Sequence, residues 1–139
     1  NKVVKHHGVP FLDKKEKKLV LSSSNTNDIT QLLGPPSTKS TFDNDVWIYI
    51  ERKTTNSSKL LDFGQKKILI SNVLILEIDN RGLLVKKDFF DIDDMQKIDF
   101  SDQETQLVYS KRSFVYDFLS SLRQKANDPL GKRKRKREF

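Results

Sequence analysis

The chain has 139 residues, of which 35% are hydrophobic, 32% are charged and none is cysteine. This length suits one domain with tails, and the lack of cysteine excludes disulfides, thiolate nucleophiles and cysteine metal sites. The net charge of +7 is concentrated at the ends: residues 1–18 carry +4 and residues 132–138 carry +5, which leaves the middle at about −2. A nearly neutral middle disfavours a nucleic-acid-binding core, whereas basic ends attract any polyanion, including an anionic membrane.

The N-terminal third predicts a polar leader followed by two short helices. Residues 1–9 have no apolar spacing and are expected to be flexible. A first helix is expected within residues 10–21, with a proline in its first turn. A second helix is expected over residues 26–33, because Asn25 is a good N-cap and Gly34 can end the helix in a left-handed conformation.

The central part predicts a three-stranded antiparallel sheet. Residues 45–53 are rich in β-branched and aromatic side chains, which favours a strand. Two further strands are expected over residues 67–79 and 83–90, which flank the tight-turn signal Asp-Asn-Arg-Gly at 79–82. Short helices packed on such a sheet predict an α+β domain with a two-layer sandwich.

The C-terminal part predicts an acidic segment, a helix and a tail. Residues 88–104 contain seven acidic residues and a single lysine. An amphipathic helix is expected over residues 111–126, with an apolar stripe formed by Phe114, Phe118 and Leu122. A single domain is therefore predicted over residues 10–128, and residues 129–139 are expected to form a disordered basic tail.

The sequence offers only weak candidates for a metal-binding or catalytic site. The adjacent His6 and His7 lack a third ligand at metal-site spacing, so a solvated pair is favoured over a metal site. The Asp91–Asp94 cluster lacks the glycine and glutamate of an EF-hand, which favours a solvated loop over a calcium site or a docking surface. The sequence pattern also indicates no catalytic nucleophile–base set and no dinucleotide-binding motif. We therefore expect a non-enzymatic protein without a cofactor or metal.

The strand over residues 45–53 is apolar on both faces. Trp47 and Tyr49 share one face, and Val46, Ile48 and Ile50 share the other. One interpretation is structural: one face packs under the N-terminal helices and the other under the helix at 111–126. The other interpretation is functional. Trp47 and Tyr49 would dock a partner protein, and Phe42 in the preceding loop would extend the same patch.

The C-terminal tail supplies a separate candidate site. Six consecutive basic residues could bind anionic lipid, or could serve as a nucleic-acid arm or a localisation signal. They are Lys132, Arg133, Lys134, Arg135, Lys136 and Arg137. The residues alone leave these possibilities open.

Three sequence pieces, in order, resemble the outer-membrane assembly lipoproteins of the SmpA/OmlA (BamE) family. They are Leu33-Gly34-Pro35-Pro36 at the end of a short helix, Trp47-Ile48-Tyr49 in a strand, and the hairpin turn Ile78-Asp79-Asn80-Arg81-Gly82. The resemblance covers about residues 10–90, and the remainder is a C-terminal extension. This family resemblance favours an anionic membrane, over a nucleic acid, as the target of the basic tail.

The resemblance implies a non-enzymatic accessory subunit of the outer-membrane β-barrel assembly machinery. Such a subunit would bind a partner lipoprotein subunit, with anionic lipid as a further candidate partner. It would lie at the periplasmic face of the outer membrane, anchored by a lipid on a cysteine upstream of Asn1. The alternatives are a basic-tailed nucleic-acid-binding protein, which the acidic flanks of the aromatic strand disfavour, and a free inhibitor-like or scaffold domain.

Overall fold

The fold is centred on one antiparallel sheet of five strands, seen in a computed structural model that describes residues 2–57, 66–97 and 110–127. The strand order is β1-β3-β4-β5, and β2 pairs with the first half of β3. The strands are β1 Lys2–Gly8, β2 Thr38–Thr41, β3 Asp45–Ser57, β4 Lys66–Ile78 and β5 Leu84–Phe90. β1 and β2 therefore share one edge of β3, and β5 lies at the opposite side of the sheet.

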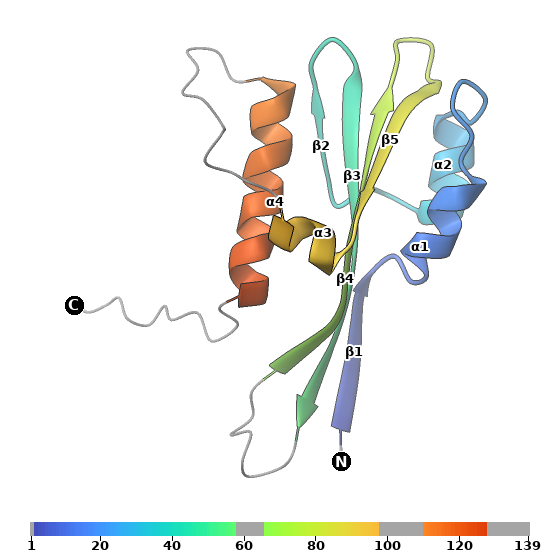
Figure 1. Cartoon of the computed structure of the whole chain (residues 1–139). Coiled ribbons are helices and arrows are strands. Elements are labelled where there is room, and N and C mark those ends of the chain that lie inside the picture. Colours follow the sequence, from blue (N-terminus) through green and yellow to red (C-terminus); the bar gives the residue numbers. More distant parts are fainter. Residues whose placement is uncertain (1, 58–65, 98–109, 128–139) are drawn as a thin grey trace.

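Helices cover both faces of this sheet (Figure 1). α1 (Leu12–Lys15), the short 3-10 helix η1 (Glu16–Lys18) and α2 (Thr26–Leu33) lie on one face. α3 (Ile92–Lys97) and α4 (Lys111–Asn127) lie on the other. The predicted α+β class, with short helices packed on an antiparallel sheet and a C-terminal helix, is confirmed. α4 adds a third layer to it.

α2 forms where local sequence predicts it. The Asn25 side chain accepts a hydrogen bond from the Asp28 amide at 2.9 Å, and Asp28 Oδ2 accepts one from the Asn25 amide at 3.0 Å. This reciprocal pair satisfies backbone donors that a helix start otherwise leaves free. The helix ends at Gly34, whose positive φ of 78° suits a residue without a β-carbon.

Each face of the sheet has its own apolar core. Tyr49 and the adjacent β4 residues Leu74 and Leu76 pack under α1 and α2, together with Leu12 and Ile29. The second core lies under α3 and α4, and it is formed by Val46, Ile48, Val73, Ile75, Met95, Leu119 and Leu122. The structural interpretation of the aromatic strand is thus confirmed. Successive residues of β3 enter different cores because side chains alternate across a strand.

Three local predictions need correction. The supposed leader, residues 1–9, contains β1, which pairs with the second half of β3. The segment between α2 and β3, expected to be a loop, contains β2, so the sheet has five strands instead of the predicted three. In the acidic segment, residues 88–90 belong to β5, and the Asp91–Asp94 cluster, predicted as a loop, begins α3; residues 98–104 lie outside the described part of the chain. β1 and β2 are polar edge strands, and hydrogen bonds to β3 hold them without an alternating apolar pattern.

Candidate functional site

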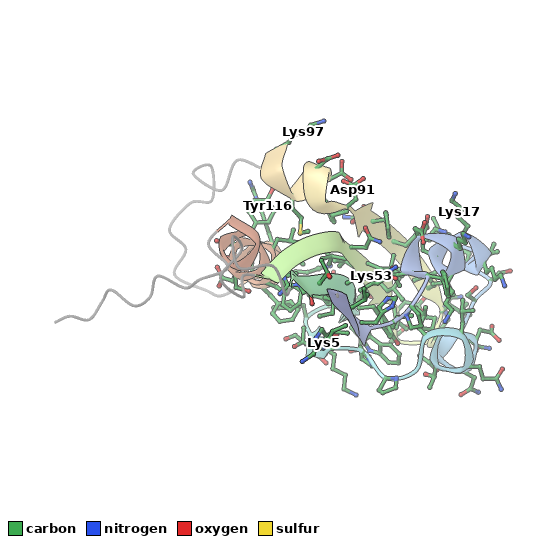
Figure 2. The ribbon with its side chains drawn as sticks, turned by 90° about the horizontal axis from the view of Figure 1, so that it is seen from below. Lys5, Lys17, Lys53, Asp91, Lys97 and Tyr116 are labelled. Carbon is green, nitrogen blue, oxygen red and sulfur yellow. The ribbon has the colours of Figure 1, made fainter. Side chains whose placement is uncertain are left out.

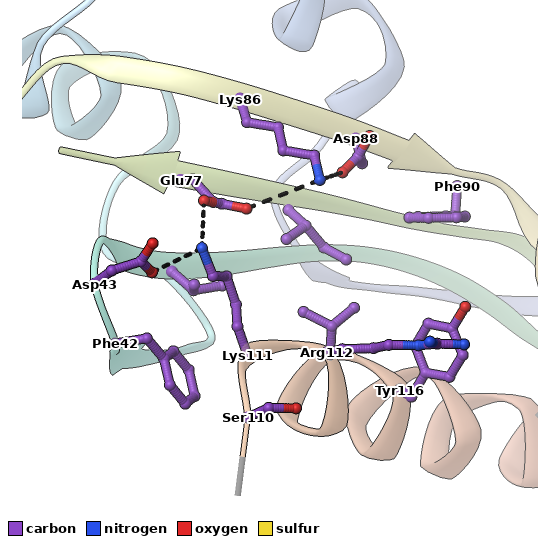
Figure 3. Close-up of a pocket in the computed structure, with 13 residues that line it drawn as sticks. Phe42, Asp43, Glu77, Lys86, Asp88, Phe90, Ser110, Lys111, Arg112 and Tyr116 are labelled. Carbon is purple, nitrogen blue, oxygen red and sulfur yellow. Dashed lines mark hydrogen bonds and ion pairs between the residues drawn. The ribbon is translucent and has the colours of Figure 1, made fainter. Parts of the chain in front are cut away.

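A groove of about 660 Å³ lies beside the start of α4 (Figure 3). Its walls come from the turn between β2 and β3, from β4 and β5, and from the first turns of α4. We call it the α4 groove; it is lined by Phe42, Asp43, Val46, Ile75, Glu77, Lys86, Asp88, Phe90, Ser110, Lys111, Arg112, Val115 and Tyr116. Segments distant in sequence therefore meet there, as is common for binding sites on small domains.

Apolar side chains line the interior of the groove. Val46 and Ile75 are buried core residues, and Phe90 and Val115 pack partly buried against the same core. Phe42 stands at one end, where its ring centroid lies 6.0 Å from that of Phe114 at an interplanar angle of 51°. This tilted contact is a favourable aromatic geometry. The groove thus offers an apolar interior with an aromatic end.

Ion pairs form the charged rim of the groove. Lys111 Nζ lies 2.8 Å from Asp43 Oδ1 and 2.9 Å from Glu77 Oε1, so it links α4 to the β2–β3 turn and to β4. Lys86 Nζ lies 3.9 Å from Glu77 and 3.8 Å from Asp88 (Figure 3). These pairs hold the start of α4 against the sheet and surround the apolar interior with both signs of charge.

The same contacts shift two pKa values at the rim. The Lys111 hydrogen bond, followed by the Asn44 backbone amide, lowers the pKa of Asp43 below its ordinary value. Hydrogen bonds to Asp43 and Glu77 raise the pKa of Lys111. Each shift favours the charged form of its group. Asp43 and Lys111 therefore stay ionised at neutral pH.

The structure does not bring the three predicted docking aromatics together. Phe42 packs on the α4 face, whereas Trp47 and Tyr49 belong to the core under α1 and α2. The prediction of one continuous patch is wrong, because the β2–β3 turn directs Phe42 to the opposite side of the sheet. Trp47 remains partly exposed, with Lys39 Nζ 5.7 Å from its ring centre.

Tyr49 has a structural contact that the sequence did not reveal. Its side chain is fully buried, and its hydroxyl donates a hydrogen bond to the Gly34 carbonyl at 2.8 Å. Burial raises the pKa of Tyr49 to about 12. Tyr49 therefore ties the end of α2 to the sheet, and its predicted role in partner binding stays a prediction, as do those of Phe42 and Trp47.

Glu51 is a buried carboxylate that sequence reasoning treated only as a strand flank. It is 3% exposed and accepts hydrogen bonds from the amides of Phe11 (2.9 Å) and Leu12 (3.0 Å), and from Asn72 Nδ2 (3.2 Å). His6 Nε2 lies 2.8 Å from Glu51 Oε2, the oxygen that also accepts from the Phe11 amide. Both histidines are exposed to solvent, as predicted, but His6 is in addition paired with this buried carboxylate. Side chains alternate along a strand, so Glu51 shares the face of β3 that carries Trp47 and Tyr49. This spacing was the signal in the sequence that Glu51 faces the helices α1 and α2.

The acidic cluster Asp91–Asp94 also stabilises the start of α3. Asp91 Oδ1 accepts a hydrogen bond from the Asp94 amide at 2.8 Å, and Asp94 Oδ2 accepts one from the Asp91 amide at 3.1 Å. This reciprocal capping begins α3. Within the described ranges, no group of three or more His, Cys, Asp or Glu side chains is placed to hold a metal ion. The basic residues 132–137 of the tail lie outside these ranges.

The structure is a small α+β domain with an apolar groove, rimmed by ion pairs, beside α4. A family model for the outer membrane protein assembly factor BamE domain matches residues 11–88. The chain therefore belongs to the BamE family, a non-enzymatic family of assembly factors associated with the outer membrane. No curated protein and no solved structure gives a significant match to the chain.

The family match divides the α4 groove. Phe42, Glu77 and Lys86 lie within residues 11–88, whereas α4 lies beyond them. One wall of the groove thus comes from the family domain and the facing wall from the extension. None of the helices in the described parts of the chain has the length and apolarity to cross a bilayer.

Proposed function

We propose that the chain is an accessory subunit of the outer-membrane β-barrel assembly machinery and that it binds a partner lipoprotein subunit through the α4 groove. The role as an assembly factor follows from the family. The observation that carries the binding site is the apolar interior of the groove, bounded by Phe42 at one end and by paired charges at its rim. Such a combination suits a protein partner, because apolar anchors supply binding energy and rim charges select the partner.

The proposed location is the periplasmic face of the outer membrane, with a lipid anchor attached upstream of Asn1. The basic residues 132–137 would add attraction to anionic headgroups, each worth about 1 kcal/mol near such a surface. A single lipid chain gives marginal and reversible binding, so a second attraction of this kind would strengthen the anchor. The family match gives no support to the alternative of a nucleic-acid-binding protein.

The test is capture of assembly-machinery subunits from solubilised outer membranes by the tagged full-length chain. Phe42→Ala is expected to reduce capture of the partner subunit, because loss of an aromatic anchor typically costs about 2 kcal/mol or more of binding. Lys86→Glu changes the groove rim at a side chain that is 60% exposed, so it tests the same surface with little effect on the core. Lys5→Glu on β1 is the matched charge control away from the groove.

Melting curves of each variant separate binding from folding. Reduced capture by both groove variants, with Lys5→Glu unchanged, supports the proposal. Wild-type capture by Phe42→Ala and Lys86→Glu would remove the groove from partner binding. In that case Phe42 is a packing residue for Phe114, and its substitution would lower the melting temperature without changing capture.

A further inference from the structure

β5 forms one edge of the sheet, because the strand order β1-β3-β4-β5 gives it a single neighbouring strand. Figure 2 looks along the strands and shows Lys5 of β1 and Asp91, directly after β5, on opposite sides of the sheet. The start of β5 is bonded along its outer edge. The Leu84 amide donates to the Ser24 carbonyl at 2.8 Å, and the Leu84 carbonyl accepts from the Ser22 amide at 2.7 Å. The turn before α2 therefore occupies the first position beside β5.

The rest of this edge presents unpaired backbone groups. Leu84 turns its amide and carbonyl away from β4, and such outward positions recur at every second pair of an antiparallel ladder. The ladder shifts by one residue directly after Leu84, so the next outward residues of β5 are those opposite Leu76 and Leu74. They are Lys87 and Phe89. None of the residues that the structure describes is hydrogen-bonded to the backbone groups of these two residues.

The side chains at the alternate positions of this edge belong to the α4 groove. Lys86, Asp88 and Phe90 all line the groove, and Figure 3 shows them in a row along β5. The Lys86 and Asp88 side chains are 60% and 46% exposed, and Lys86 Nζ lies 3.8 Å from Asp88 Oδ2. A strand added beside β5 would place every second side chain next to this row. The open edge and the groove therefore form one continuous surface.

A second copy of this chain does not fit the edge. Two antiparallel β5 strands can match Lys86 with Asp88 in one register only. That register sets Phe90 opposite Leu84, where the Ser22–Ser24 segment already lies. The register centred on Asp88 avoids this overlap but puts two like charges directly opposite each other, which is destabilising. These contacts favour a segment of a different protein as the occupant.

We propose that an extended segment of the partner subunit adds to the outer edge of β5 as a further antiparallel strand, bonded to the backbone of Lys87 and Phe89. This mode of binding rests on the proposed function, because it assumes that the partner subunit occupies the α4 groove. In strand addition the main-chain hydrogen bonds supply affinity, and alternate side chains supply specificity.

The groove-facing row of β5 defines the chemistry of the added segment. An acidic residue would lie opposite Lys86, a basic residue opposite Asp88, and a β-branched or aromatic residue opposite Phe90, because such cross-strand pairs stabilise a sheet. The strands are antiparallel, so the order in the partner is β-branched or aromatic, then basic, then acidic, at every second position.

The test is binding of the synthetic peptide Thr-Thr-Val-Thr-Lys-Thr-Glu-Thr-Thr to the isotope-labelled full-length chain, followed by NMR. The Lys87 and Phe89 amides should shift and become protected from hydrogen exchange when the peptide is added. The matched control is the peptide with its lysine and glutamate exchanged, which should bind about tenfold more weakly because like charges then face each other. The double variant Lys86→Glu, Asp88→Lys should reverse this preference.

Backbone pairing is tested on the peptide itself. N-methylation of the two threonines that flank the lysine removes the amides that would face β5, and it should abolish binding. N-methylation of the valine and the glutamate removes amides that would point away from β5, and it should leave most of the binding intact.

The outcomes separate strand addition from the proposed function. Equal binding of the two charge-exchanged peptides, or no binding of either at about 1 mM, would overturn strand addition. Reduced capture by Phe42→Ala and Lys86→Glu together with that result would leave the groove as the partner site with another mode of binding. Selective peptide binding with wild-type capture by both variants would instead overturn the groove as the partner site.

Discussion

Replacing Glu51 by glutamine is expected to lower the free energy of unfolding by about 1–3 kcal/mol. Glutamine has nearly the shape of glutamate, so the substitution changes hydrogen bonding with little change in packing. The four groups that face Glu51 are all donors: two backbone amides, Asn72 Nδ2 and His6 Nε2. One oxygen of glutamine can still accept from Leu12 and Asn72. The new NH₂ group then faces the Phe11 amide and His6.

The magnitude follows from that mismatch. A buried donor left without an acceptor costs about 1–3 kcal/mol, and the Phe11 amide, whose bond to Glu51 is only part-buried, falls toward the lower end of that range. The contact with His6 adds less, about 1 kcal/mol or below, because the His6 side chain is 35% exposed and water screens the pair. The expected loss is therefore dominated by the start of α1, and only a minor part comes from β1.

Urea unfolding followed by Trp47 fluorescence measures the change. The matched control is His6→Gln, which removes only the partly exposed partner and is expected to cost below about 1 kcal/mol. An equal slope and a lower midpoint for Glu51→Gln would report a pure loss of stability. A cost of Glu51→Gln below about 0.5 kcal/mol would refute the reasoning, because the carboxylate would then contribute no more than an ordinary surface residue.

The same carboxylate predicts a pH dependence. Burial by itself would raise the pKa of Glu51, but hydrogen bonds from His6, the Leu12 and Phe11 amides and Asn72 outweigh it, so the folded-state pKa lies below the ordinary value. The unfolded chain then binds the proton more readily. The contribution of Glu51 is present above its unfolded pKa of about 4.3 and is lost as pH falls through the folded pKa. Wild type should lose more stability than Glu51→Gln below about pH 4.

Two further substitutions test the cores on either face of the sheet. Tyr49→Phe removes the hydroxyl that donates to Gly34 and should cost about 0.5–1.5 kcal/mol in urea unfolding, and an unchanged midpoint would mean that this bond does not hold α2. Leu119→Ala opens a cavity at a fully buried position on the inner face of α4 and should cost about 2–5 kcal/mol. The exposed control on the same helix, Ser121→Ala, should cost less than about 0.5 kcal/mol. Equal stability of these last two variants would place α4 outside the core.

Elements governed by neighbouring residues were predictable from the sequence. α2 matches its predicted range of 26–33 because its cap and its terminating glycine are local. The turn at 79–82 is local too: Asp79 Oδ1 accepts from the Arg81 amide at 2.9 Å and from the Leu83 amide at 3.0 Å, and Gly82 has a φ of 81°. Each of these contacts spans no more than four residues, so the sequence pattern contains the whole interaction.

Interactions between distant segments were decided by the tertiary structure. β1 has a polar sequence and forms a strand only because it pairs with the edge of β3, which lies more than forty residues further along the chain. The α4 groove requires Phe42, Glu77 and Lys111 to meet, and the buried environment of Glu51 requires residues 6, 11, 12 and 72 to converge. The sequence by itself determined which residues are apolar, capped or charged. Which of them face one another depends on how the helices pack on the two faces of the sheet, because hydrogen bonds and ion pairs depend on distance in space and not on separation along the chain.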